Sequence, residues 1–158
     1  MVTEFKKTPK QVEAIKLLGD PTKTNILLSG GVRSGKTFIL CYAVFVRAMK
    51  CPGSRHLMVR LRFNHAKQSL CLDTIPKMLR LCFPGVDVKL SKVDWYYTLP
   101  NGSEVWIGGL DDGDRVEKIL GKEFCTIYFN ESSQIEYKAV GIVKTRLAMK
   151  CDGLINKL

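Results

Sequence analysis

The stretch that decides the fold is Asn25-Ile26-Leu27-Leu28-Ser29, followed at once by Gly30-Gly31-Val32-Arg33-Ser34-Gly35-Lys36-Thr37. The first five residues form a short apolar run, which predicts a buried strand. The next eight fit the pattern G-x-x-x-x-G-K-[ST] at every fixed position, and a helical stretch from Lys36 to Lys50 follows. A chance glycine-rich turn is the alternative. Motif and context together predict a phosphate-binding loop between a strand and a helix.

The chemistry of such a loop assigns a role to several of its residues. Glycines allow consecutive backbone N–H groups to converge on phosphate oxygens, and the helix N-terminus adds partial positive charge. We expect Lys36 to reach the β- and γ-phosphates of ATP, and the hydroxyl of Thr37 to bind Mg²⁺. Arg33 is either a cation that neutralises charge on the γ-phosphate or a solvent-facing loop residue. The predicted nucleotide-binding set is Gly30, Gly31, Val32, Arg33, Ser34, Gly35, Lys36 and Thr37.

A second strand should end in polar residues beside this loop. Residues 125–129 are hydrophobic, and Asn130 and Glu131 follow them directly. Glu131 offers a carboxylate that can polarise the attacking water as a general base. Alternatively, it only caps the next helix. Asn130 stands where an acidic residue is usual, and it can hydrogen-bond a metal-bound water without adding charge. We predict Glu131, Lys36 and Arg33 as catalytic residues, and Thr37 and Asn130 as the metal site.

The first helix adds one further candidate. Thr8 suits an N-cap and Pro9 suits the first helical position, which predicts a helix that begins there. Gln11 lies on it, and its amide can both donate and accept a hydrogen bond. Gln11 is therefore predicted to read the edge of adenine, with an exposed helical glutamine as the alternative.

The rest of the chain alternates between strand and helix patterns. Strands are predicted at 56–61, 86–90, 95–99 and 104–108, and helices at 64–82 and 136–149, with Pro76 expected to kink or break the first of these helices. Pro100-Asn101-Gly102 marks a hairpin turn. This alternation indicates an α/β protein with a mainly parallel sheet and an inserted antiparallel hairpin.

Composition excludes several classes of protein. The chain has 158 residues and a net charge of +10, with 46% hydrophobic and 25% charged residues, so it is not a disordered tail. Its longest apolar run, residues 38–46, is too short for a membrane span, which needs about 20 residues. The six cysteines lack zinc-ligand spacing, and we interpret them as reduced and mostly buried. The positive charge favours a polyanion such as nucleic acid.

Five features in order resemble the large subunit of tailed-phage terminases. They are Thr8-Pro9-Lys10-Gln11, the phosphate loop with its internal Arg33, residues 57–60 leading into 64–70, residues 101–112 (N-G-S-E-V-W-I-G-G-L-D-D), and residues 127–135 (I-Y-F-N-E-S-S-Q-I). The resemblance implies a RecA-like P-loop three-layer sandwich with an extra strand between the phosphate-loop strand and the acidic strand. It also implies a P-loop ATPase that powers packaging of double-stranded viral DNA into the procapsid.

The resemblance carries further expectations. Partners would be double-stranded DNA, the portal protein, the terminase small subunit and further copies in a ring, in the host cytoplasm at the procapsid and not in the mature virion. Residues 1–158 would be the N-terminal part of the ATPase domain, truncated before the coupling strand, and the nuclease domain would be absent. Many such proteins carry a trans-acting arginine finger just before a glycine. Here Leu120 occupies that position, which leaves Arg115 or Arg146 as the candidate arginine finger.

Basic and aromatic clusters leave alternatives open. Seven basic residues near the second strand and its helix either contact DNA phosphates or form a solvated face with one arginine aimed at the nucleotide: Arg55, Arg60, Arg62, His65, Lys67, Lys77 and Arg80. Trp95, Tyr96 and Tyr97 favour a hairpin core or an interface over base stacking. The alternative functions are a non-enzymatic nucleotide-binding assembly module and a helicase-like ATPase of a mobile element.

Overall fold

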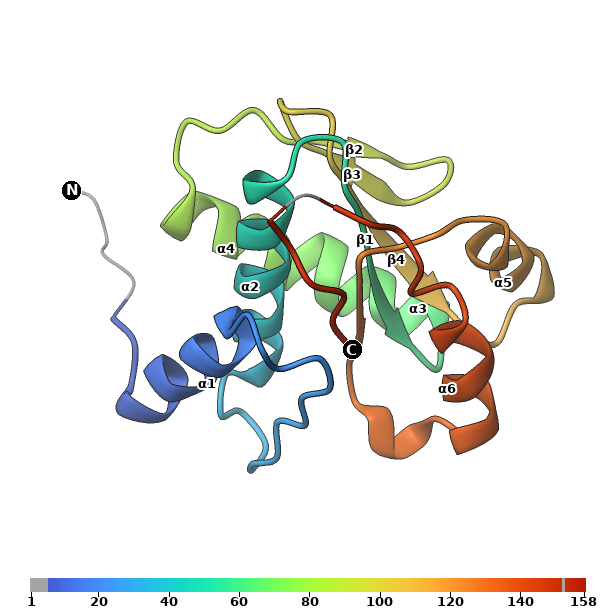
Figure 1. The fold of residues 1–158 in the computed structure, drawn as a ribbon, viewed down its shortest axis with the longest axis horizontal. Helices are drawn as coiled ribbons and strands as arrows, with labels where there is room; N and C mark the ends of the chain where they lie inside the picture. Colours follow the sequence, from blue (N-terminus) through green and yellow to red (C-terminus); the bar gives the residue numbers. More distant parts are fainter. Residues whose placement is uncertain (1–5, 152) are drawn as a thin grey trace.

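The computed structural model describes residues 6–151 and 153–158. Its elements in chain order are α1 (Pro9–Gly19), α2 (Lys36–Lys50), β1 (Arg55–Arg60), α3 (Phe63–Ala66), the π-helix η1 (Lys67–Thr74), α4 (Ile75–Cys82), β2 (Lys89–Ser91), β3 (Tyr96–Thr98), β4 (Glu104–Gly109), α5 (Gly113–Leu120), β5 (Thr126–Phe129), the 3₁₀ turn η2 (Ser132–Gln134) and α6 (Tyr137–Lys144). The strands form one open sheet in the order β2-β3-β4-β1-β5, between two layers of helices (Figure 1). The predicted α/β class is confirmed.

β1 lies inside the sheet and is parallel to both of its neighbours. Arg60 is in register with Gly109 of β4, and Val59 with Phe129 of β5, so the carboxyl ends of all three strands meet at one edge. β2 and β3 add an antiparallel hairpin to β4. The turn before β4 is the predicted one, with Gly102 at φ 82° and Leu99 N donating to Ser103 O at 2.9 Å.

The alternating side chains of β1 separate two cores. Met58 packs with α1, α2 and the 63–82 helical segment on one face. Leu57 and Val59 pack on the other face, with Ile119 of α5 and Val143 of α6. Figure 1 shows α1, α2 and α4 on one side of the sheet and α5 and α6 on the other. The result is the predicted three-layer sandwich.

The predicted strand at 25–29 does not form, and Leu27 is 81% exposed. Instead Leu158 N donates to Thr24 O at 2.8 Å, and Ile26 N donates to Leu158 O at 3.0 Å, which is the pattern of a parallel pair. A ladder needs a partner along its length, and among the described residues this segment has a single one, Leu158, as its backbone partner. The apolar run therefore stays irregular apart from this contact.

The last residues of the chain supply that partner. Lys157 forms a parallel bridge with Thr126 of β5, so residues 157–158 lie between β5 and the segment that leads into the phosphate loop. The resemblance implied an extra strand at this place in the sheet. Two residues are too few for a strand, but their backbone already bonds to both neighbours.

Two predicted helices differ from the structure in ways with a physical cause. The helix at 64–82 begins at Phe63 and changes from α to π geometry before Pro76, which has no backbone N–H to donate. The last helix ends at Lys144 and not at Met149. Beyond it the backbone bonds to the start of β5 instead, where Phe124 N donates to Arg146 O at 2.7 Å.

The environments of the aromatic and sulfur side chains agree with the predictions. Trp95 and Tyr97 are buried, as expected for a hairpin core. Cys41, Cys71 and Cys125 are buried free thiols. Within the described residues no helix is both long and apolar enough to cross a membrane.

Candidate nucleotide-binding site

The phosphate loop joins the 24–26 segment to α2 through two left-handed residues. Gly35 is the N-cap of α2 with φ 80°, and Arg33 has φ 62°. Position 35 favours glycine because of its left-handed dihedral, and a Cβ there would also displace the flexible end of the Gln11 side chain. The loop therefore reaches the N-terminus of α2 while in contact with α1.

Lys36 folds its ammonium group back into the loop. Its Nζ donates to Gly30 O at 2.7 Å, to Gly31 O at 2.8 Å and to Ser34 Oγ at 3.0 Å. Three acceptors therefore hold the cation within the motif, where phosphate oxygens could replace them. The sequence-predicted Gly30, Gly31, Ser34 and Lys36 are brought together around one charge.

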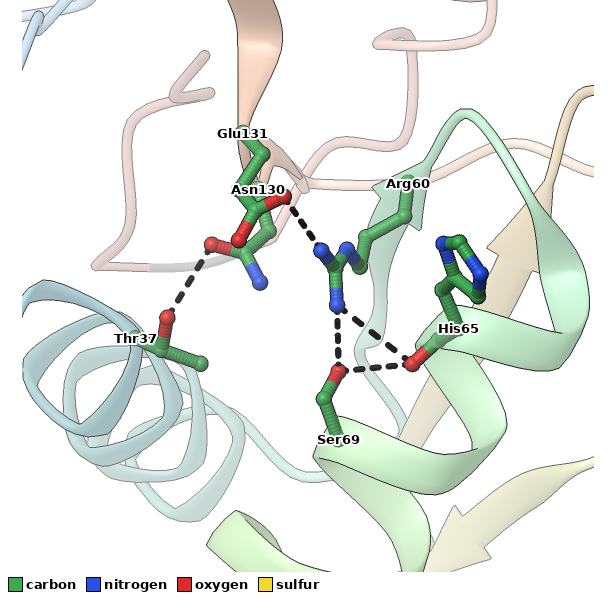
Figure 2. A network of polar contacts seen from close by, with 6 residues as sticks. All are labelled: Thr37, Arg60, His65, Ser69, Asn130 and Glu131. Atoms are coloured by element: carbon green, nitrogen blue, oxygen red, sulfur yellow. Dashed lines mark hydrogen bonds and ion pairs between the residues drawn. The ribbon is translucent and has the colours of Figure 1, made fainter. Parts of the chain in front are cut away.

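The helix after the loop meets the end of β5 through one polar contact. Thr37, in the first turn of α2, donates its hydroxyl to Asn130 Oδ1 at 3.2 Å (Figure 2). Asn130 is 5% exposed and directly follows β5. Both groups offer oxygen donors, the type that Mg²⁺ prefers. No cluster of three acidic, histidine or cysteine side chains with metal-binding geometry occurs in the described part. A Mg²⁺ site at Thr37 and Asn130 stays a prediction.

Glu131 pairs with Arg60 at the end of β1. The backbone of Glu131 is left-handed, with φ 55°, which is uncommon for a non-glycine residue. Arg60 Nη2 donates to Glu131 Oε2, and Arg60 Nη1 donates to Ser69 Oγ at 2.8 Å and to His65 O at 3.4 Å (Figure 2). The Arg60 side chain is 12% exposed and that of Glu131 48%. The predicted general base is thus held by a fixed, nearly buried guanidinium.

This role of Arg60 was not foreseen from the sequence, which placed it in a basic cluster and allowed one arginine to face the nucleotide. A signal was present, because Arg60 lies next to the end of the second predicted strand and Glu131 follows the last one. Neighbouring parallel strands bring such ends together, but the sequence does not state which strands are neighbours.

The stretch Gly109-Leu110-Asp111 fixes the start of the helix that carries His65 and Ser69. Asp111 Oδ1 accepts from Phe63 N at 2.9 Å, which caps the first turn of α3. A Cβ on Gly109 would collide with the backbone of Phe63, so the strand end and the helix start touch through backbone. This contact explains the glycine and the aspartate of a stretch whose role the sequence left open.

Gln11 contributes to the cap of its own helix. Thr8 N donates to Gln11 Oε1 at 2.9 Å, and Gln11 N donates to Thr8 Oγ1 at 3.3 Å, which forms a capping box. The amide oxygen is therefore engaged, while Nε2 lies beside Gly35. A cavity of about 450 Å³ between α1 and the loop is lined by Gln11, Leu17 and Leu28. Adenine recognition by Gln11 stays a prediction.

A larger cavity of about 1290 Å³ borders the loop and reaches both Asn130 and Glu131. Lys77 of α4 also lines it. Val32 is 95% exposed and Arg33 is exposed as well, at the tip of the loop. The predicted loop residues thus line one cleft together with Asn130 and Glu131. Gly31 is connected to this cleft through the hydrogen bond that its carbonyl oxygen accepts from Lys36.

The two candidate finger arginines are engaged within the chain. The Arg115 guanidinium lies 3.7 Å from the Phe63 ring centroid and 3.7 Å from Asp112 Oδ2. Arg146 Nη1 donates to Leu120 O at 3.2 Å. A role in a neighbouring copy would require either side chain to leave these partners, so the finger stays a prediction.

The seven basic residues do not share one set of contacts. Arg55 begins β1 and pairs with Glu104 at 3.0 Å, whereas Arg60 ends the same strand at the opposite edge of the sheet. Lys67 lies over the ring of Trp95 at 4.7 Å. The remaining four are exposed: Arg62, His65, Lys77 and Arg80. DNA contact by this group stays a prediction, and its members are not equivalent.

A second polar network lies at the amino ends of β1 and β5. His56 is fully buried, with Nε2 at 2.8 Å from Ser54 Oγ and Nδ1 at 2.7 Å from Thr126 Oγ1. Arg47 of α2 donates from Nε to the same Thr126 hydroxyl at 2.8 Å. Burial, and secondarily the charge of Arg47, lowers the pKa of His56 to about 3. His56 is therefore a neutral imidazole at physiological pH.

Comparison with known proteins then identifies the chain. Residues 27–156 match the family described as "Terminase large subunit, T4likevirus-type, N-terminal". The chain belongs to the terminase large subunit family. The match begins just before the phosphate loop and includes Arg60, Asn130 and Glu131. A search of curated proteins gave no match.

Solved structures of terminases share the fold. The large terminase of a thermophilic bacteriophage superposes with a TM-score of 0.76 at 18% identity, covering 93% of this chain and 37% of that one. The same terminase in complex with ATP-gamma-S gives 0.70 at 16%, covering 93% and 36%. The ATPase domain of the Thermus phage P74-26 large terminase gives 0.66 at 15%, covering 91% and 61%. The chain thus spans a little over a third of the first of these terminases, and its fold is the RecA-like terminase ATPase fold.

Proposed function

We propose that this terminase chain binds and hydrolyses ATP and supplies the motor activity that packages double-stranded viral DNA into a procapsid. The observation that carries the proposal is the contact between Thr37 and Asn130, which joins the phosphate loop to the polar end of β5. It builds a cleft with a cation, oxygen donors and a carboxylate on its walls. Support also comes from the terminase of the thermophilic bacteriophage, which has been solved with ADP and with ATP-gamma-S.

Binding of a triphosphate follows from the loop's own contacts. The ammonium of Lys36 exchanges its bonds to Gly30 O, Gly31 O and Ser34 Oγ for phosphate oxygens. The freed ammonium and the backbone N–H groups at the N-terminus of α2 then bind the anion. The N-terminal end of α2 carries no acidic residue in its first turn, so nothing there opposes the negative charge.

Hydrolysis requires a carboxylate that can accept a proton from water. Glu131 is the strand-end carboxylate of this cleft, and in the structure Arg60 neutralises it. Turnover therefore requires the Glu131 carboxylate to leave its ion pair with Arg60 and to accept a hydrogen bond from the attacking water. Ser69 Oγ and His65 O keep Arg60 in place meanwhile. Mg²⁺, when bound, would be held by Thr37 and, through water, by Asn130, and it would offset charge on the phosphates.

The partners follow from the family and the charge. The net charge of +10 suits a polyanion such as double-stranded DNA. Portal protein, terminase small subunit and ring-forming copies, at the procapsid in the host cytoplasm, belong to the same proposal. A non-enzymatic nucleotide-binding module is the second candidate, favoured by the neutral Asn130 and by the paired state of Glu131.

Binding of a fluorescent ATP analogue to Lys36→Ala and Lys50→Ala tests the site. Both lysines lie on α2, but Lys50 is an exposed residue at its far end. We expect Lys36→Ala to weaken binding at least tenfold and Lys50→Ala to bind as the parent does. Equal affinities in all three proteins would exclude the loop as the site. Release of phosphate by the parent then separates a hydrolase from a binding module.

A further inference from the structure

Cysteine sulfurs converge where β5 begins, away from the nucleotide cleft. The Sγ atoms of Cys125 and Cys151 lie 2.7 Å apart. Cys151 also hydrogen-bonds Cys51, which follows α2. Cys125 is fully buried, and Cys151 is partly exposed. Cys151 is therefore the more exposed residue of the closest pair, and Cys125 is the buried one.

The backbone holds this pair together independently of the sulfurs. Phe124 N donates to Arg146 O at 2.7 Å, and Met149 N donates to Phe124 O at 3.2 Å. After Cys151 the chain returns to the same place, where Lys157 N donates to Cys125 O at 3.1 Å. The residues on both sides of Cys151 are thus fastened to Cys125 or its neighbour. These backbone hydrogen bonds therefore keep the two cysteines next to each other.

We propose that Cys125 and Cys151 are a modification site for small disulfide oxidants such as oxidised glutathione, which convert the pair into an intramolecular disulfide. The Cys151 thiolate attacks one glutathione sulfur and releases the first glutathione as a thiolate. The Cys125 thiolate then attacks Cys151 Sγ and releases the second. The two protons lost by the cysteines end on the two glutathione thiols, and the two electrons reduce the glutathione disulfide.

The bond would fix a particular part of the fold. It closes a loop between residues 26 positions apart and fastens the segment that ends at Lys157 and Leu158. Those two residues join β5 to the strand-like contact at Thr24 and Ile26, ahead of the phosphate loop. Desolvation raises the pKa of Cys151 to about 11, so the reaction accelerates as the pH rises above neutral.

Incubation of the folded chain with oxidised glutathione, followed by alkylation and mass spectrometry, tests the proposal. We expect the loss of two hydrogen atoms, a linked peptide pair containing Cys125 and Cys151, and a melting temperature higher by roughly 5–15 °C that dithiothreitol reverses. Cys151→Ser should abolish the linkage. Cys41→Ser, at a buried thiol beside Met58, should leave it intact.

The same measurement gives the outcomes that overturn the proposal. These are a linkage of Cys151 to Cys51, a mixed disulfide with glutathione that never resolves, or no change in mass. Cys51→Ser, which retains both proposed partners, separates the first from the expected result. Because the experiment measures mass and melting temperature, its result does not depend on whether the chain binds ATP.

Discussion

Replacing His56 by Gln should make the stability of this domain less sensitive to acid. The imidazole is fully buried between Ser54 and Thr126, and its pKa is about 3 in the folded protein against 6.5 for an ordinary histidine. Because the folded pKa lies below the unfolded one, the unfolded chain binds the proton more readily at every pH between them. The free energy of unfolding therefore falls as the pH is lowered from about 7 towards 3.

The magnitude follows from these two pKa values. At pH 7 the unfolded imidazole is mostly neutral, and the contribution is small. At pH 5 the unfolded histidine is almost fully protonated while the folded one is neutral, which lowers the free energy of unfolding by about 2 kcal/mol. Stability of a domain is typically only ~5–15 kcal/mol, so a loss of this size is readily measured.

Urea unfolding at pH 7 and pH 5 measures the effect as a difference within each protein. Between pH 7 and pH 5, the free energy of unfolding of the parent should fall by about 2 kcal/mol more than that of His56→Gln. His65→Gln is the matched control, because His65 is the other histidine and is exposed. The free energy of unfolding of His65→Gln should fall by as much as that of the parent between the two pH values. An equal loss in the parent and in His56→Gln would show that the buried imidazole does not carry the acid sensitivity.

Two further substitutions test the strand end. Glu131→Gln should keep nucleotide affinity but lower turnover by roughly 10²–10⁴-fold, the usual contribution of a general base, and equal steady-state rates would leave Glu131 only a structural role. Asn130→Asp should preserve the fold and raise the apparent affinity for Mg²⁺, because a charge replaces the amide beside Thr37. A Mg²⁺ titration of ATP hydrolysis checks this, and a variant that needs more Mg²⁺ than the parent would remove Asn130 from the metal site.

Patterns of residues that are close together in the sequence account for the elements that were predicted correctly. Thr8, Pro9 and Gln11 specify the start of α1, and the capping box in the structure shows how. Helix α2 has the bounds that the sequence predicted, from Lys36 at the end of the phosphate loop to Lys50. The hairpin turn at Gly102 follows from its positive φ, which glycine adopts without strain. In each case the information lies within a few residues of the feature.

Non-local pairing explains the elements for which the sequence-based prediction was wrong. The run from Asn25 to Ser29 has the apolar character of a strand, yet it stays irregular because, in the described part of the chain, its backbone pairs only with Leu158. Helix α6 stops early because Arg146 O accepts a backbone hydrogen bond from Phe124 N. Neither outcome can be read from local patterns, since the competing hydrogen bonds come from residues far along the chain.

The two residues after β5 have different neighbours in the candidate site. Asn130 is buried and contacts Thr37 on α2, whereas Glu131 adopts a left-handed conformation and contacts Arg60 at the end of β1. Adjacent positions thus contact different elements around the cleft. The conformation of Glu131 costs of order 1–3 kcal/mol and is sustained by its ion pair with an arginine that other groups already hold.

In the proposed hydrolysis, the pairing of Glu131 with Arg60 is the point at which other parts of the chain can act. Arg60 is held by Ser69 on η1, and the helix that carries η1 begins at Phe63, where Asp111 caps it. A shift of that helix would move the guanidinium and so change how readily the carboxylate reaches water. Asn130 bonds instead to Thr37 on α2, so the proposed metal binding and the proposed activation of water can change independently, although the two residues are neighbours in sequence.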